Sequence, residues 1–161
     1  MVTAMDDYEQ WIKDFEWNIP EDYTIAKAVD KHAKDPDRVA IYWEDDKGNE
    51  RAITYRELRD EANRFANALL DSGIEKGDRL IVMLPRLPEV FFTQIGAFKI
   101  GAIIVPCPEM LREKDVEYRV NNCGATTIVT SPPAAEHVDS VRDKTPLKNF
   151  IIVGGDRDGW H

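Results

Sequence analysis

The first part of the chain carries the apolar spacing of amphipathic helices rather than of strands. The pattern predicts one helix over residues 6–17, broken before Pro20. The apolar positions that set this helix are Tyr8, Trp11, Ile12 and Phe15. Thr24 is placed to cap a second helix. The residues expected to share one face of that second helix are Ile25, Ala28, Val29 and His32.

The next segments have the pattern of two strands and a long helix. RVAIYWE (38–44) and ERAITY (50–55) flank the short turn DDKGN, which predicts a β-hairpin. Thr54 and Glu57 have the spacing of a capping box, and Gly73 is placed to end the helix that follows. The residues expected on the buried face of this helix are Leu58, Ala62, Phe65, Ala66 and Leu69.

From residue 79 onward, strand and helix patterns alternate four times with short connections. The strand patterns are RLIVMLP (79–85), AIIVP (102–106), ATTIVT (125–130) and NFIIVGG (149–155). Helix patterns occupy 89–101, 112–124 and 132–143. RLIVMLP is a continuous apolar run instead of an alternating one, which is typical of a strand covered on both faces, and AIIVP is expected to be a second buried strand. The fold class predicted is therefore α/β, with a mostly parallel sheet flanked by helices, preceded by N-terminal helices and the short hairpin.

Glycine and proline mark the ends of these elements. Gly101 and Gly124 are placed to end two of the helices in the left-handed conformation. Pro85 and Pro106 would end two of the strands, because proline inside a central strand removes a ladder hydrogen bond. In open α/β sheets, ligands bind outside the carboxyl ends of the strands. Any site is therefore expected in the loops 85–88, 106–110, 130–133 and 154–156.

Composition limits the class of partner. The chain has 161 residues and a net charge of −9, so neither nucleic acid nor an anionic membrane is expected as its main partner. No run of about 18 apolar residues is present, so no membrane span is expected. The first residues are acidic and lack the pattern of a secretory signal. Cys107 and Cys123 have no metal-binding spacing, and a cytoplasmic location with reduced thiols is expected.

The usual catalytic and phosphate-binding motifs are missing. There is no GxGxxG after a strand, no GxxxxGK[ST] and no GxSxG. The three histidines lack metal spacing, and no metal site is predicted. A phosphoacceptor domain would need carboxylates at the strand ends, where this chain has Pro85, Pro106 and Thr130. EDDKGNE (44–50) fits a hairpin turn better than a calcium loop, because Lys47 occupies a ligand position.

Three stretches considered together resemble one family. They are ITYRELRDEANRFANALLDSGIEKGDRL, IVMLPRLPEVFFTQIGAFKIGAIIVPCPEM and EYRVNNCGATTIVTS. These stretches resemble the N-terminal portion of AMP-forming acyl-CoA synthetases, members of the adenylate-forming superfamily. The resemblance runs from about Tyr23 to Val153, and LPRLPE is most similar to the medium-chain branch. It implies two domains of sequence, an N-terminal helical segment over 1–22 and part of a large α/β domain over 23–161.

The resemblance implies a specific reaction for a complete enzyme. A carboxylic acid of short or medium chain length reacts with ATP and Mg²⁺ to give an acyl-adenylate, and CoA then takes the acyl group. The Ser/Thr/Gly-rich phosphate loop, the adenine and ribose motifs and the mobile lysine of the family do not occur in these 161 residues. The chain alone is therefore expected to be inactive, to bind none of these cofactors tightly and to contain no catalytic residue. The alternative is a free-standing binding or interaction module of the same fold.

The resemblance also implies one local site. In the acetyl-CoA synthetase branch, the turn after the GAxxx strand faces the adenine of CoA, and the matching residues here are Pro108, Glu109 and Met110. This chain lacks the glycine-rich turn of that branch. It also has no arginine over 133–139, where that branch places arginines. The acyl preference and the oligomeric state are not predicted by these residues.

Overall fold

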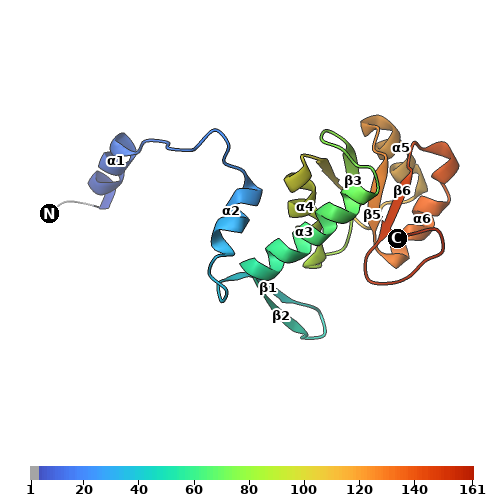
Figure 1. Cartoon of the computed structure of the whole chain (residues 1–161), viewed down its shortest axis with the longest axis horizontal. Coiled ribbons are helices and arrows are strands. Elements are labelled where there is room, and N and C mark those ends of the chain that lie inside the picture. The colour runs from blue at the N-terminus through green and yellow to red at the C-terminus, as the bar shows by residue number, and fades with distance from the viewer. Residues whose placement is uncertain (1–3) are drawn as a thin grey trace.

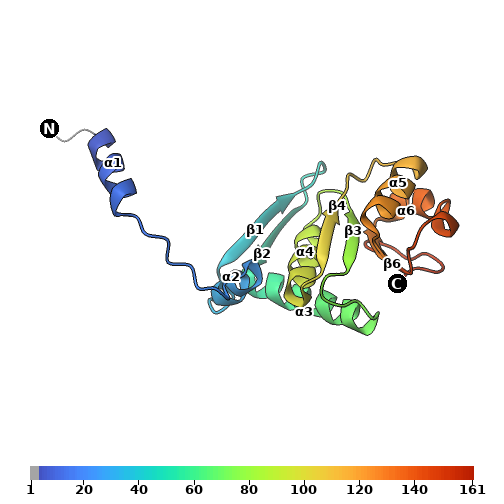
Figure 2. The same ribbon diagram turned by 90° about the horizontal axis from the view of Figure 1, so that it is seen from above.

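The N-terminal helix stands apart from the other elements. The structure is a computed structural model that describes residues 4–161, with side chains from Tyr8 onward; residues 1–3 of the predicted N-terminal segment lie outside the described residues. α1 (Ala4–Asp14) is the first predicted helix, and it begins and ends earlier than expected. Figures 1 and 2 show that α1 projects from the rest of the chain at the end of an extended linker. The apolar side chains that set its pattern are exposed, namely Tyr8, Trp11, Ile12 and Phe15.

α2 (Ile25–His32) begins at the predicted cap and buries most of the predicted face, since Val29 is buried and Ala28 and His32 are half-buried. The Lys27 N–H donates to Thr24 Oγ1 over 3.2 Å, which confirms the cap. Ile25 was expected on the buried face and is 62% exposed, so that prediction is wrong. The helix packs against α3 and α4 through the side of Ala26 and Val29, which leaves Ile25 facing solvent.

The hairpin and the long helix form as predicted. β1 (Val39–Glu44) and β2 (Glu50–Thr54) pair antiparallel. Asp45 closes the turn, since its carboxylate accepts from the side chain and the backbone of Asn49, and these bonds hold its pKa below the usual range. In the capping box of α3 (Tyr55–Asp71), the Thr54 N–H donates to Glu57 Oε2 over 2.7 Å. The predicted face of α3 is buried, with Phe65 half-buried.

A four-stranded parallel sheet forms the centre of the fold. Its strands are β3 (Arg79–Met83), β4 (Ile103–Pro106), β5 (Thr127–Thr130) and β6 (Asn149–Ile152). The order across the sheet is β4-β3-β5-β6, with every pair parallel. α3 and α4 (Glu89–Ile100) cover one face, and α5 (Glu113–Cys123) and α6 (Pro132–Asp139) cover the other (Figure 2). This arrangement confirms the predicted fold class.

The side chains of β3 divide between two hydrophobic clusters. Leu80 and Val82 point toward α3 and α4, whereas Ile81 and Met83 point toward α5 and α6. All four are almost fully buried. The continuous apolar run in the sequence is therefore explained by burial on both faces.

β4 is less buried than its sequence predicted. It lies at the edge of the sheet, and Ile103 is 47% exposed. The apolar run AIIVP was expected to form a buried strand, which is wrong for this edge position. Pro106 is nevertheless the last residue of β4, as predicted. An edge strand tolerates proline because the absent N–H would point away from the sheet, where no neighbouring strand needs it.

The segment after β6 folds back and packs on α6. The helix predicted over 132–143 is divided into α6 and a 3₁₀ turn at Arg142–Lys144. Asp139 at the end of α6 accepts hydrogen bonds from Arg142, Arg157 and the Trp160 indole, over 2.7, 2.6 and 3.1 Å. Trp160 is buried against Phe150, with ring centroids 5.4 Å apart. One carboxylate thus connects three parts of the C-terminal region.

Two glycines set close geometry around α4. Gly101 ends α4 with φ of 74°, which confirms the predicted left-handed position. Gly96 lies in the middle of α4, where it meets α3. A Cβ added at Gly96 would lie 2.7 Å from the Ala62 carbonyl oxygen and 3.0 Å from the Phe65 ring. The two helices therefore approach too closely for any side chain at Gly96.

The first test concerns this helix contact. Gly96→Ala should lower the free energy of unfolding by about 1–3 kcal/mol, because the added methyl overpacks a backbone contact. Helix propensity alone predicts the opposite sign, since alanine is favoured over glycine in a helix by about 1 kcal/mol. Urea unfolding gives the measurement. Ala68→Gly, at an exposed position of α3, calibrates the propensity effect in this protein. A Gly96→Ala protein more stable than the parent would contradict the close contact.

A second test concerns Asp139. Burial alone would raise the pKa of this carboxyl group, but the bonds from Arg157 and Trp160 and the charge of Arg142 outweigh burial and lower the pKa. A lowered folded-state pKa contributes stability that is present above the unfolded pKa of about 3.9 and is lost as the pH falls through the folded value. Asp139→Asn should therefore cost about 1–3 kcal/mol at pH 7, and the difference from the parent should shrink below about pH 4.

Urea unfolding at pH 7 and pH 3 measures this effect. Asp143→Asn changes an exposed carboxylate on the adjoining 3₁₀ turn and is the matched control, with little change expected at either pH. A constant difference between the Asp139→Asn protein and the parent across this pH range would show that Asp139 does not stabilise the fold as a carboxylate.

Candidate functional site

The carboxyl ends of the four parallel strands meet at one edge of the sheet. β3 connects to β4 on one side, whereas β5 connects to β6 on the other, so the chain changes direction between β3 and β5. In open α/β sheets, such a switch point is the usual position of a ligand crevice. The loops expected to contain a site are therefore brought to the same edge, which we call the carboxyl edge (residues 84–88, 107–112, 131–133 and 153–156).

The turn after β4 contains the three predicted site residues. The backbone N–H of Cys107 donates to the Val82 carbonyl over 2.9 Å, which extends the pairing with β3 by one residue. Pro108 is exposed, and Met110 is 83% exposed. Glu109 is half-buried, because its carboxylate accepts from the buried Ser131 hydroxyl at the start of α6. The turn therefore presents two apolar side chains, Pro108 and Met110, to solvent and holds the carboxylate of Glu109 against the protein.

Two hydrogen bonds reach across the ends of the central strands. Thr130 Oγ1, fully buried, donates to the Met83 carbonyl over 2.9 Å and joins β5 to β3. Ser131 donates to Glu109 and so joins the segment after β5 to the segment after β4. Because β3 lies between β4 and β5, the second bond spans the end of the central strand. The sequence patterns gave no sign of either bond.

A histidine lies between two charged residues beside this turn. Arg112 Nη1 lies 2.7 Å from His137 Nε2, and His137 Nδ1 lies 2.7 Å from Glu113 Oε1. Arginine only donates, so Nε2 accepts and the proton of the neutral ring is on Nδ1. The pKa of Glu113 is lowered, first by its own backbone N–H and then by His137. The sequence has no arginine over 133–139, but the fold brings Arg112 against that segment.

The two cysteines show no sign of reactivity. Both are free thiols, and Cys107 is buried at the end of β4. Burial is the main cause that raises the pKa of the Cys107 thiol. A raised thiol pKa lowers the fraction of thiolate, which is the nucleophilic form. Cys107 is thus a packing residue of the α5–α6 cluster.

The hairpin is attached to the loop after β3. The Trp43 indole donates to the Arg86 carbonyl over 2.7 Å, and Arg51 pairs with Glu89 over 2.8 Å. An apolar groove of about 400 Å³ lies between the hairpin and this loop. The apolar side chains that line it include Ile41, Trp43, Leu84, Leu87, Val90 and Phe91. The segment PRLP (85–88) connects β3 to α4, and Pro85 follows the end of β3 as predicted.

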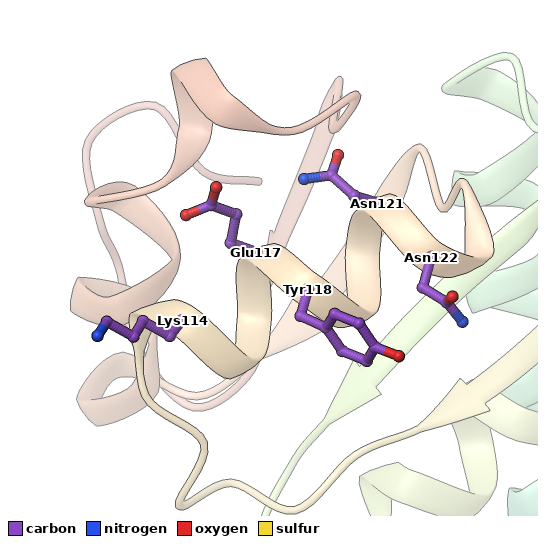
Figure 3. A pocket seen from close by; sticks show the side chains of 5 residues that line it. All are labelled: Lys114, Glu117, Tyr118, Asn121 and Asn122. Atoms are coloured by element: carbon purple, nitrogen blue, oxygen red, sulfur yellow. The ribbon is translucent and has the colours of Figure 1, made fainter.

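A second hollow, of about 570 Å³, lies on the outer surface of α5. Figure 3 shows its lining side chains, all of which come from α5, namely Lys114, Glu117, Tyr118, Asn121 and Asn122. Asn121 donates to the Lys144 carbonyl over 3.0 Å, so one of its polar groups is already used within the fold. The side chains in Figure 3 diverge along the helix instead of converging on one point. This hollow on a single helix is a poorer candidate than the carboxyl edge.

The described part of the chain offers no metal centre and no membrane helix. Among the side chains that the structure describes, from Tyr8 onward, no three of His, Cys, Asp or Glu gather closely enough to hold a metal ion. In the same residues, no helix is long and apolar enough to cross a bilayer.

Comparison with known proteins gives consistent matches over most of the chain. The family model described as AMP-binding enzyme matches residues 29–159. The acetyl-coenzyme A synthetase of Bacillus subtilis is 39% identical over 136 residues, which are 82% of this chain and 23% of that protein. The human mitochondrial acyl-coenzyme A synthetase ACSM3 is 32% identical over an alignment of 163 positions, which covers 95% of this chain and 28% of that protein.

Solved structures agree with these sequence matches. The crystal structure of Brucella canis acyl-CoA synthetase superposes with a TM-score of 0.78 at 28% identity, covering 93% of this chain and 29% of that one. A long-chain-fatty-acid-CoA ligase from Archaeoglobus fulgidus gives a TM-score of 0.76 at 22% identity, which supports the fold alone. The chain spans about a quarter of the length of the curated relatives that it matches.

Proposed function

Because this chain belongs to the AMP-binding enzyme family, we propose that it is the N-terminal part of an AMP-forming acyl-CoA synthetase. The complete enzyme is an acid–thiol ligase. Its first half-reaction joins a carboxylic acid to ATP, with release of pyrophosphate, to form an acyl-adenylate. In the second half-reaction, the sulfur of CoA attacks the acyl carbonyl and AMP leaves. The single observation that carries this proposal is the match of 131 consecutive residues, 29–159, to the family.

In this proposal, the chain contributes scaffold and one wall of the CoA entrance. The sheet and its helices supply a rigid body, and the turn after β4, which contains Pro108, Glu109 and Met110, supplies the wall. The exposure of Pro108 and Met110 at the switch-point edge supports this assignment, since both present apolar surface against which an adenine ring can pack. None of the three residues takes a chemical part in the reaction.

The carboxyl edge does not fit ATP and Mg²⁺. Glu109 already accepts from Ser131, and Glu113 is beside His137, so these carboxylates are not arranged around a common point. The strand ends carry no glycine-rich loop with a lysine to surround a triphosphate. In the proposal, ATP and Mg²⁺ are therefore bound by parts of the enzyme beyond these 161 residues, and no step of phosphate chemistry is assigned to this chain.

The proposed substrate is a carboxylic acid of short or medium chain length. LPRLPE resembles the medium-chain branch, and the relatives include an acetyl-coenzyme A synthetase and the acyl-coenzyme A synthetases ACSM1 and ACSM3. A cytoplasmic location is proposed from the composition. The human relatives ACSM1 and ACSM3 are named as mitochondrial proteins.

A third test measures activity with two lengths of protein. The 161-residue chain should release no pyrophosphate with acetate, butyrate, hexanoate or octanoate, because the phosphate loop and the mobile lysine are absent. The complete enzyme should release pyrophosphate with at least one of these acids and form the corresponding acyl-CoA in the presence of CoA. The intact mass of the protein isolated from its native cell shows which of the two lengths is made.

Two results would contradict the proposal. Turnover by the 161-residue chain would show that it carries its own catalytic residues. A protein isolated from its native cell with the mass of these 161 residues and no ligase activity would favour the free-standing binding or interaction module.

A further inference from the structure

The contact between Ser131 and Glu109 departs from the local role of a serine at this position. Ser131 is the residue before the first turn of α6, where a serine hydroxyl ordinarily accepts a hydrogen bond from a backbone N–H two or three residues on. Here the next two residues are Pro132 and Pro133, which have no N–H. The Ala134 N–H donates to the Ser131 carbonyl over 3.2 Å. The hydroxyl therefore makes no capping bond.

The Ser131 hydroxyl, which makes no capping bond, instead bonds to a residue far away in the sequence. It donates to Glu109, 22 residues earlier, and the Ser131 side chain is buried while it does so. The carboxylate lies beside the N-terminus of α6, where the helix dipole favours a negative charge. Two independent effects, a charge-assisted hydrogen bond and the helix dipole, thus hold the side chain of Glu109 in one position.

This bond fixes the middle of the turn after β4. The start of the turn is fixed by the Cys107 N–H on the Val82 carbonyl, and its end by the Leu111 N–H on the Pro108 carbonyl, over 3.3 Å. Between these points, Glu109 has the one side-chain hydrogen bond that the described residues give to the stretch 108–111. Met110 follows Glu109 directly and is 83% exposed, so its place on the surface is set by the backbone of this turn.

We propose that Glu109 is a positioning residue. Its hydrogen bond from Ser131 holds the turn Pro108–Met110 in the shape that CoA meets. This proposal rests on the proposed function for the identity of the ligand. Glu109 does not contact CoA or the reacting atoms. Its carboxylate faces the protein, and the surface offered to CoA is that of Pro108 and Met110.

Four variants of the complete enzyme test the proposal. Glu109→Ala and Ser131→Ala should each raise the Michaelis constant for CoA about tenfold, the change expected when a hydrogen bond to a charged group is lost. The Michaelis constant for ATP should change less than twofold. Glu109→Gln keeps an oxygen that accepts from Ser131 and should restore most of the affinity. The double variant should be no worse than either single variant, because both remove the same bond.

Glu117→Ala is the matched control, since it removes a carboxylate from the outer face of α5 (Figure 3). It should leave the constant for CoA unchanged. Equal rises in the constants for ATP and CoA in the Glu109→Ala enzyme would overturn the proposal, because they would indicate a general loss of fold. An unchanged constant for CoA in that enzyme would overturn it as well.

Hydrogen exchange separates this proposal from the proposed function. In the 161-residue chain, Glu109→Ala should speed exchange of the Leu111 amide, which donates to the Pro108 carbonyl, about tenfold and leave the amides of β3 unchanged. If the complete enzyme makes no acyl-CoA but exchange increases as stated, the proposed function fails and the positioning role of Glu109 stands. Unchanged exchange at Leu111 would overturn the positioning role whatever the activity.

Discussion

The central strand β3 has no face and no edge open to solvent. Helices cover both of its faces, and β4 and β5 occupy both of its edges, so Leu80 to Met83 are almost fully buried. A strand in this position needs parallel neighbours reached by helical crossovers, and those helices must lie on both sides of the sheet. The close contact of α3 and α4 at Gly96 is one result of this packing. The common position of all four carboxyl ends is another.

This arrangement concentrates the candidate chemistry at one edge. The segments after β4 and β5 lie on either side of the end of β3, and their side chains meet across it through Ser131 and Glu109. Arg112 and His137 meet beside the same turn. The edge holds a defined turn with an exposed apolar surface, and it lacks the cluster of carboxylates or the loop of glycines that phosphate chemistry would need. The account therefore separates a CoA wall in this chain from ATP chemistry elsewhere in the enzyme.

Local patterns predicted the elements well, because caps, glycines and apolar periods act over a few residues. Thr54 with Glu57, Gly101 and Gly124 all have the predicted roles. The failures concern contacts between distant residues. The period of α2 could not tell whether Ile25 or Ala26 would face α3, and an apolar run could not reveal that β4 is an edge strand. The helix predicted over 132–143 ends at Asp139, where bonds to Arg157 and Trp160 attach the folded-back tail.

The sequence predicted where the strand ends would meet, but not the interactions between residues there. Strand-ending prolines were sufficient to locate the carboxyl edge, since parallel strands share one direction. The need for glycine at position 96 could not be predicted, because it comes from the close approach of a carbonyl group of another helix. Ser131 was not singled out either, because proline at the next two positions changes its hydroxyl from a cap into a long-range donor. The roles of Pro108, Glu109 and Met110 toward CoA stay predictions. Hydrogen exchange of the complete enzyme with and without CoA tests them most directly. The account predicts that CoA slows exchange at residues 107–111 and leaves the outer face of α5 at Lys114–Asn122 unchanged. Slower exchange on that face, with none at 107–111, would contradict it.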